Sequence, residues 1–289
     1  MHKSICVVVP IYNHWHLMGS FFEKIRNQSL PANFWRLIVV DNGSTSLPDA
    51  ASLPEFVELI VCSAPGSYAA RNLALQRANA DLIVFTDADC QPCENWLNEL
   101  WSTYTTSGPM VILAGAVTVK KLTTGAPNDY EVYDILCGIP QKHYVGKRGY
   151  AVTANLAVPR DAFNNVGLFD GNRFSGGDAE FCKRALNNGY RLNYLPEAEV
   201  LHPARSTWEE IETKARRIKG GQIKNGPLAR RLMFFIATFI YPFLSILHLL
   251  QSDVSRLDKR RAMRVSVRIS KVQICEVLRL IWGGQAERR

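Results

Sequence analysis

The sequence predicts an α/β fold, in which a sheet is flanked by helices, with a helical appendage at the C-terminus. Short apolar runs rich in β-branched residues alternate with amphipathic stretches through the first half of the 289 residues, as in repeated β-α-β units. The charge changes late in the chain: residues 214–289 carry 17 Lys and Arg against 4 Asp and Glu, whereas residues 1–213 carry 17 against 22. We therefore expect one α/β domain over 1–213 and a basic, hydrophobic helical segment over 214–289.

Two β-α-β units account for the first half of the chain. The expected strands are 5–9, 37–40, 57–61 and 82–85, and the expected helices are 17–28 and 69–78. Strands joined by helices run parallel, so we expect their carboxyl ends to meet at one rim of the sheet, where ligands bind in such folds.

The second half is less regular. We expect strands over 110–119 and 151–158, short strands over 192–195 and 200–201, and helices over 128–136 and 176–188. The last two strands lead to His202 and Pro203.

Polar segments follow three of the predicted parallel strands. Residues 10–13 follow the first, 41–44 the second, and 87–89 the fourth. Asp87 and Asp89 are spaced to point to the same side, and two carboxylates on one side suit Mg²⁺ or Mn²⁺ carrying a diphosphate. A solvated turn would explain the pair equally well, but three polar turns at one rim favour a binding site.

The motifs, taken in order, resemble those of an inverting GT-A glycosyltransferase of family 2, which implies a Rossmann-like mixed sheet flanked by helices. They are V-V-V-P-I-Y-N at 7–13, V-D-N-G-S at 40–44, G-S-Y-A-A-R-N at 66–72, F-T-D-A-D at 85–89, T-A-N-L-A-V at 153–158, G-G-D-A-E-F at 176–181, and His202. The resemblance implies transfer of a sugar from a UDP-, GDP- or dTDP-sugar with Mn²⁺ or Mg²⁺ as cofactor.

The resemblance assigns donor-binding roles. Asp89 would hold the metal, with Asp87 directly or through water, and His202 would be a further ligand, although a His before Pro is commonly a turn residue. Asp41 resembles the carboxylate that binds the base or ribose, although Asp-Asn-Gly also favours a turn. Arg71 would reach the phosphates, unless it forms a surface ion pair. The remaining expected nucleotide contacts are Pro10, Tyr12, Asn13 and Ser44.

Inversion by direct displacement needs one general base near the acceptor hydroxyl. Asp178 is the expected base, because it matches the second residue of the family's Glu-Asp pair at the start of a helix, although it would also serve as a cap. Gly177 replaces the usual Glu, and Glu180 follows closely. Asn155, Gly177 and Glu180 are expected at the donor-sugar and acceptor pocket; a buried structural role for Asn155 stays open.

The C-terminal segment combines an apolar run with basic residues. The run over 232–250 has the length of a short membrane span, but Pro242 interrupts it. We expect a re-entrant or in-plane pair of helices on an anionic membrane, the second with Val265, Ile269, Val272, Cys275, Leu278 and Trp282 on its apolar side. A helical hairpin packed on protein, or a homodimer through these helices, is the alternative. Lys214, Arg216, Arg217 and Lys219 would close over the diphosphate or face lipid.

Seven cysteines at irregular spacing, with no signal peptide, favour a reducing compartment. We therefore expect a transferase of the hexosyltransferase type at the cytoplasmic face of the membrane, acting on a lipid-linked glycan, a polyprenyl-linked acceptor or another polysaccharide precursor. A catalytically inactive nucleotide-sugar-binding scaffold is the first alternative. A nucleotidyltransferase would need a Gly-rich phosphate loop after the first strand, which residues 10–13 do not provide. Nucleic acid suits the apolar run less well than lipid.

Overall fold

The computed structural model describes residues 3–173 and 175–287, and the chain divides into two compact units. The first, here called the sheet unit, comprises Met1–Thr118, Pro140–Asn172 and Gly177–His202. The second, the helical unit, comprises Val119–Ile139, Arg173–Gly176 and Pro203–Arg289. Residues 119–139 and 203–213 thus belong with the C-terminal helices, whereas the expected boundary lay between 213 and 214.

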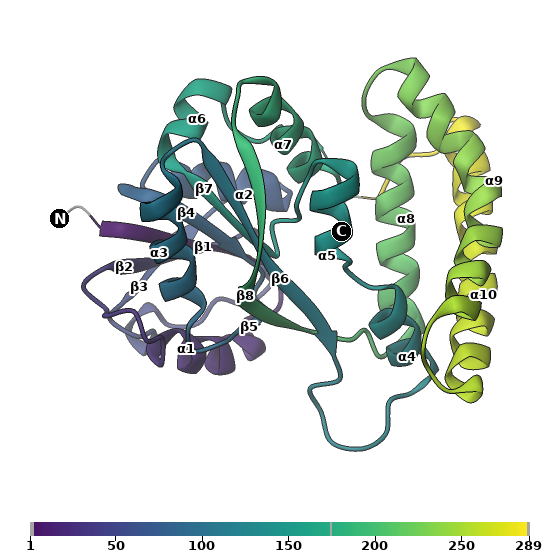
Figure 1. Ribbon diagram of the computed structural model, residues 1–289, viewed down its shortest axis with the longest axis horizontal. Coiled ribbons are helices and arrows are strands. Elements are labelled where there is room, and N and C mark those ends of the chain that lie inside the picture. Colours follow the sequence, from purple (N-terminus) through teal and green to yellow (C-terminus); the bar gives the residue numbers. More distant parts are fainter. Residues whose placement is uncertain (1–2, 174, 288–289) are drawn as a thin grey trace. The chain divides into compact units, whose positions relative to one another are not determined.

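An eight-stranded mixed sheet, in the described part of the chain, has the order β3-β2-β1-β4-β7-β6-β8-β5. The order can be followed in Figure 1. β1, β2, β3 and β4 pair in parallel, whereas β7 is antiparallel to both β4 and β6. The strands are β1 Lys3–Ile11, β2 Trp35–Asp41, β3 Val57–Val61, β4 Ala80–Thr86, β5 Gln91–Pro92, β6 Val111–Lys120, β7 Asn155–Pro159 and β8 Arg191–Pro203.

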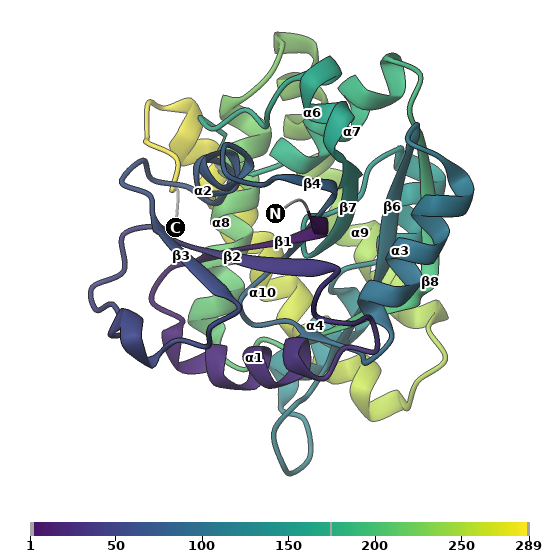
Figure 2. The ribbon, with the colours of Figure 1, turned by 90° about the vertical axis from the view of Figure 1, so that its left-hand side faces the viewer.

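The parallel strands form because their residues are apolar on both faces: Ile5 to Val9 and Leu37 to Val40 are all fully buried. The chain moves from β1 outward to β2, but from β3 back across to β4. Because crossovers are right-handed, the two connecting helices must lie on opposite faces of the sheet. Figure 2 shows α1 (Met18–Arg26) and α2 (Ser67–Leu75) on opposite sides of β1 and β2.

Helices cover the sheet within its own unit. Two further helices, α6 (Arg160–Val166) and α7 (Gly177–Asn187), pack on the same face of the sheet as α2. Phe163 of α6 and Phe181 of α7 form one aromatic cluster with Phe85 and Phe169. The remaining helical segments of this unit are η1 Trp15–Leu17, η2 Ala50–Ser52, α3 Trp96–Ser107, α5 Gln141–His143 and the π-helical η3 Tyr144–Arg148.

The predicted mixed sheet flanked by helices is confirmed, and the differences lie in the second half. β7 begins at Asn155 rather than 151. The two short strands expected before His202 are one strand, β8, so His202 is a strand residue and not a turn residue. Pro196, Glu197 and Glu199 interrupt the apolar pattern of β8, since much of the strand is only partly buried.

The helical unit contains α4 Asp129–Cys137, α8 Trp208–Lys224, α9 Leu228–Gln251 and α10 Arg256–Ile281. Figure 1 shows α8, α9 and α10 running alongside one another. Capping boxes start α4 at Asn128 and α8 at Thr207, each satisfying backbone N–H groups that a helix start leaves open. α10 packs on α8 through Val265 and Ile269.

Contrary to expectation, the apolar side of α10 is partly covered by protein. Val265 and Ile269 are buried in the helical unit, whereas Leu278 and Trp282, near the end of the helix, are exposed. α9 instead presents the apolar surface: it is the one described helix long and apolar enough to cross a membrane, with a mean hydropathy of 2.0 and 11% of that window buried. Its exposed apolar residues are Leu228, Leu232, Met233, Ile236, Phe239, Ile240, Phe243, Leu244, Leu247 and Leu250.

Candidate functional site

The loops after β1 and β2 are tied together at the rim of the sheet. Ile11 lies opposite Asp41 in the parallel register, so the segments that follow them are neighbours. Asn13 has a left-handed backbone with φ 57°. Its N–H donates to Ser44 Oγ at 2.8 Å, and its Oδ1 accepts from the backbone N–H of Thr45 at 2.9 Å. Next to this junction is a hollow of about 280 Å³, lined by Asn13, Trp15, His16, Thr45, Ser46, Leu47 and Pro48.

Asp41 closes the turn that begins at the end of β2. Its Oδ1 accepts from the backbone N–H groups of Gly43 and Ser44 at 3.0 and 2.9 Å, and its Oδ2 accepts from the indole of Trp15 at 2.8 Å. The side chain is buried. The turn that Asp-Asn-Gly favours is therefore present, and the carboxylate is held rigidly beside the expected nucleotide residues.

Arg71 is fully buried and faces the end of β4, so it does not form the surface ion pair that was its alternative. Its Nη2 donates to Asp87 Oδ1 at 2.6 Å, and its guanidinium lies 5.9 Å from the Tyr68 ring. Its Nε is buried and has no hydrogen-bond partner among the described residues. Buried guanidinium N–H groups are rarely left unsatisfied, so this Nε is an exception within the described part of the chain.

Asp89 and His202 meet although they are far apart in sequence. The two-residue β5, which follows Asp89, pairs antiparallel with β8 so that Gln91 lies opposite Leu201. This pairing brings His202 Nε2 to 3.6 Å from Asp89 Oδ2, a separation too long for a hydrogen bond. His202 is buried and Asp89 is partly exposed.

These side chains fit a cation that also binds a substrate. Among residues 3–173 and 175–287 no group of three or more His, Cys, Asp or Glu could hold a metal ion. Mg²⁺-like ions commonly take one or two carboxylates from the protein and complete their coordination with phosphate oxygens and water. Asp89 and His202 suit such an incomplete site, whereas Asp87 has one oxygen occupied by Arg71.

Asp178 lies at the start of α7, facing α2 and the segment before β7. Its carboxylate accepts from the backbone N–H groups of Ala179 at 2.8 Å and Thr153 at 3.4 Å, and the phenol of Tyr68 lies near enough to favour its ionised form. Burial raises the pKa of Asp178 above its usual value, although these hydrogen bonds and the charge of Arg71 partly oppose the shift. A carboxylate with a raised pKa is suited to accept a proton.

Asn155 and Glu180 are engaged within the protein. Asn155 is fully buried; its Nδ2 donates to the carbonyls of Ala116 and Ala198, both at 2.8 Å, and its Oδ1 accepts from the indole of Trp96 at 2.9 Å. This is the structural role that the sequence left open. Glu180 accepts from Arg184 Nε at 2.5 Å, one turn later on α7.

Replacing Asn155 by Ala should destabilise the fold. The change leaves two carbonyls and an indole N–H buried without this partner, and each unsatisfied group costs about 1–3 kcal/mol. We expect the free energy of unfolding, measured with urea, to fall by about 3 kcal/mol or more. Exposed Asn164, replaced by Ala, should change it by less than about 1 kcal/mol. Unchanged stability with a loss of donor affinity would instead assign Asn155 to the sugar pocket.

Several contributing residues were not foreseen. Trp15 holds Asp41, Tyr68 reaches Asp178, and Gly115 makes room for Asn155, since a Cβ at 115 would lie 2.3 Å from Asn155 Nδ2. In sequence, each is indistinguishable from an ordinary helix, strand or loop residue.

Most of the basic side chains of α8 are held inside the helical unit. Lys214 pairs with Asp134 at 3.2 Å, Arg216 with Glu212 at 2.6 Å, and buried Lys219 donates to Thr238 at 2.9 Å. Arg217 differs, because its Nε is buried without a partner among the described residues.

The chain is similar to known proteins in sequence. A sequence profile described as "Glycosyl transferase family 2" matches residues 6–167. Glycosyltransferase AglE of Haloferax volcanii is 31% identical over 284 residues, covering 94% of this chain and 91% of the relative. The pre-mycofactocin glycosyltransferase of Mycobacterium tuberculosis is 28% identical over 217 residues, covering 71% of this chain and 44% of the relative.

Solved structures share the fold. The mannosyltransferase PcManGT of Pyrobaculum calidifontis, determined with GDP-mannose and Mn²⁺, has a TM-score of 0.62 at 17% identity and covers 98% of this chain and 88% of its own. At this identity the likeness concerns the fold alone. The sheet and helices expected from the motifs are thus those of a known enzyme architecture.

Proposed function

Because this chain belongs to glycosyl transferase family 2 and is a glycosyltransferase, we propose that it is metal-dependent and inverting, and that its donor is a nucleotide-diphosphate sugar. Its fold is GT-A, as the motifs predicted. The proposal rests on two pairs of side chains beyond the end of β4: Arg71 with Asp87, and His202 with Asp89. A buried cation with an unsatisfied N–H and a carboxylate–imidazole pair are complementary to a metal-bound diphosphate.

The donor would be held by the loops at the carboxyl ends of the strands. In this proposal Asp41 binds the base or ribose, with Pro10, Tyr12, Asn13 and Ser44 shaping the nucleotide pocket, and Arg71 binds a phosphate through its open Nε. The hollow beside Asn13 and Thr45 offers about 280 Å³ at this place. Asp41 is already fixed by three hydrogen bonds, which lowers the entropic cost of binding.

Asp89 and His202 would hold Mn²⁺ or Mg²⁺, with Asp87 directly or through water. When bound, the ion neutralises charge that develops on the leaving diphosphate. Arg71 assists from the other side, since it keeps Asp87 oriented and adds a positive charge at the same strand end. PcManGT, of the same fold, was solved with Mn²⁺ and GDP-mannose, which supports this choice.

Asp178 would act as the general base. Its buried carboxylate removes the proton from the acceptor hydroxyl while that oxygen attacks the anomeric carbon, opposite the leaving diphosphate. Two backbone N–H groups and Tyr68 orient the carboxylate. Gly177 and Glu180 lie beside it on α7, where the sugar and acceptor are proposed to bind.

A donor panel tests this function. The full chain is incubated with UDP-, GDP- and dTDP-sugars and Mn²⁺, and release of the nucleotide diphosphate is measured before and after chelation. We expect release from at least one donor, lost on chelation and restored by Mn²⁺. Binding of a donor without release, with any metal, would favour the inactive scaffold.

We also propose that the protein associates with the cytoplasmic face of a membrane, where it meets a lipid-linked or polyprenyl-linked acceptor. The exposed apolar residues of α9 support this, because monomeric soluble proteins rarely expose such a continuous stripe. A shallow surface depression of about 510 Å³ in the helical unit combines apolar and basic lining, from Ile246, Met263, Val267, Arg260 and Arg264. Apolar and basic side chains side by side suit an anionic lipid.

Charges placed on α9 should abolish membrane binding. We expect the full chain to float with vesicles of phosphatidylcholine and phosphatidylglycerol in a sucrose gradient, and the Phe243→Asp/Leu247→Asp variant to stay at the bottom, because both side chains are at least half exposed. Met110→Asp, a charge on an exposed apolar residue of the sheet unit, should float normally. Failure of the unaltered chain to float, together with a dimeric mass that the α9 variant loses, would instead assign this face to a homodimer.

A further inference from the structure

Gly177 is the residue at which this chain departs from the Glu-Asp pattern, and the ring of Tyr68 occupies the space that a side chain would need. A Cβ built on Gly177 would lie 2.8 to 2.9 Å from three ring atoms of Tyr68, closer than real Cβ atoms approach. The backbone of α7 and the ring therefore fit together only while residue 177 is glycine.

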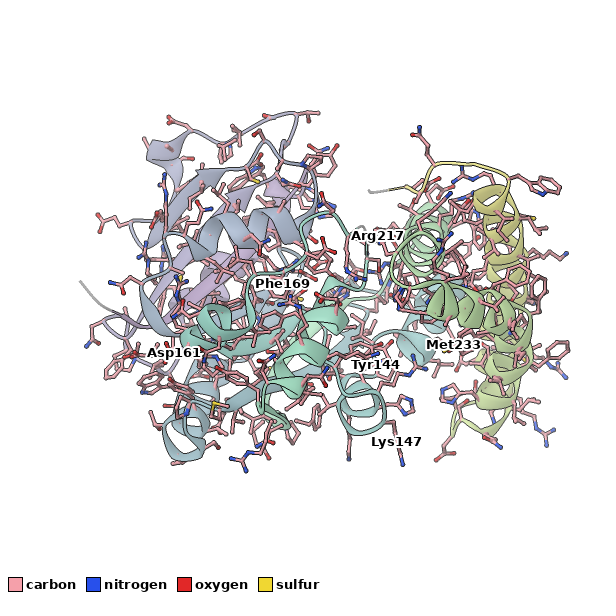
Figure 3. All side chains as sticks on the ribbon, turned by 90° about the horizontal axis from the view of Figure 1, so that it is seen from above. Tyr144, Lys147, Asp161, Phe169, Arg217 and Met233 are labelled. Carbon is pink, nitrogen blue, oxygen red and sulfur yellow. The ribbon has the colours of Figure 1, made fainter. Side chains whose placement is uncertain are left out.

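The Tyr68 ring has little freedom to move away. The ring is buried, and its centroid lies 5.7 Å from the centroid of the Phe169 ring. The guanidinium of Arg71, three residues later on α2, lies 5.9 Å from the centroid of the Tyr68 ring. Phe169, labelled in Figure 3, belongs to the aromatic cluster between α2, α6 and α7. The ring is thus clamped from several sides while its hydroxyl reaches the carboxylate of Asp178.

We propose that Tyr68 is a positioning residue for Asp178, and that glycine at 177 is required because it admits the Tyr68 ring. The inference rests on the proposed function of Asp178 as general base. The backbone N–H groups of Ala179 and Thr153 fix the carboxylate from the α7 and β7 sides, and the phenol fixes it from α2. Two backbone donors and the neighbouring phenol, from separate elements, hold one carboxylate in one orientation, as a base requires.

The groups that face Asp178 determine how its pKa should change when the phenol of Tyr68 is removed. They are Tyr68 and Arg71 from α2, Tyr150 before β7, Cys182 on α7, and the two backbone N–H groups. The hydrogen bond from Tyr68 favours the ionised carboxylate, so its loss raises the pKa of Asp178 further. Because the base must be ionised to work, the acid limb of the pH–rate profile should then move to higher pH.

Tyr68→Phe tests the role with the ring retained. We expect kcat for nucleotide release near neutral pH to fall by about tenfold, the acid limb to move to higher pH, and the KM for the donor to stay nearly constant. Tyr190→Phe is the matched control, because Tyr190 is equally buried and its hydroxyl accepts from Asn165 at 3.0 Å, away from Asp178. That variant should lose stability but keep the pH profile.

Gly177→Ala tests the space requirement. We expect it to move the acid limb in the same direction as Tyr68→Phe, because the new methyl group displaces the ring. The double variant Tyr68→Ala/Gly177→Ala should lose little more activity than the single variant Tyr68→Ala. Without the Tyr68 ring, a methyl group at residue 177 no longer has that ring to clash with. An additive double variant would overturn the coupling.

The outcomes separate this inference from the function on which it rests. If Asp178→Asn retains turnover, the assignment of the base fails. If Asp178→Asn is inactive and Tyr68→Phe has the kcat and pH profile of the unaltered enzyme, only the positioning role of Tyr68 is overturned.

Discussion

Asp178→Asn should lower the rate of nucleotide release by about 10²- to 10⁴-fold, the usual contribution of a general base. The amide has nearly the same shape as the carboxylate but cannot accept the proton of the acceptor hydroxyl. Donor affinity, measured by calorimetry, should change little, because Asp178 on α7 is not one of the proposed nucleotide contacts, which lie on α2 and after β1, β2 and β4. In the unaltered enzyme, activity should rise with pH through a pKa that burial has moved above the usual range of aspartate.

Asp161→Asn is the control for this experiment. Asp161 is an exposed carboxylate in the first turn of α6, labelled in Figure 3, and its substitution should cost little stability and no activity. Retained turnover in Asp178→Asn would contradict the assignment of the base, and lost donor binding would place Asp178 in the donor site instead.

Asp89→Asn should abolish dependence on the metal together with most of the activity. Replacing a carboxylate by an amide removes the charge that holds the cation beside His202, so we expect the rate of nucleotide release to fall by about a hundredfold or more. Mn²⁺ binding can be followed without catalysis, by paramagnetic resonance in the presence of the nucleotide diphosphate, and should weaken in parallel.

The control is Asp81→Asn, which removes an exposed carboxylate near the start of β4, the strand that Asp87 and Asp89 follow. It should leave both Mn²⁺ binding and activity intact. Equal Mn²⁺ affinity in Asp89→Asn and the unaltered chain would show that the metal binds elsewhere.

Local patterns predicted the elements whose residues are apolar on both faces. β1 to β4 were found because uninterrupted β-branched runs end in polar turns, and their order placed Asp41, Asp87 and the loop at Asn13 on one rim. β8 was predicted as two short strands, because a partly exposed strand carries charged residues and a proline that interrupt the apolar pattern of the sequence.

The contacts that complete the site depend on packing between distant segments. Trp15 on Asp41 and Tyr68 on Asp178 join residues 26 and 110 positions apart, and no local pattern marks either tryptophan or tyrosine as a partner of a carboxylate. For Asn155 the resemblance implied a place at the sugar pocket and left a buried structural role open; its hydrogen bonds to the carbonyls of Ala116 and Ala198 supply that structural role.

The C-terminal helices show why amphipathicity alone did not decide which face meets lipid. The apolar side of α10 suited an interface, but α8 and α4 cover Val265 and Ile269. The apolar run of α9 was predicted from composition, but composition does not tell whether such a run is covered by protein, and most of its apolar side chains are exposed.

The stereochemistry of the product reports whether the sugar is transferred by a single direct displacement. Proton NMR, recorded during the first minutes of donor hydrolysis, identifies the anomer released before mutarotation. Direct displacement with Asp178 as the single base predicts that the first sugar formed has the anomeric configuration opposite to that of the donor. Release of a sugar with the donor's own configuration would contradict the account, because retention needs a second displacement or an attack from the same face.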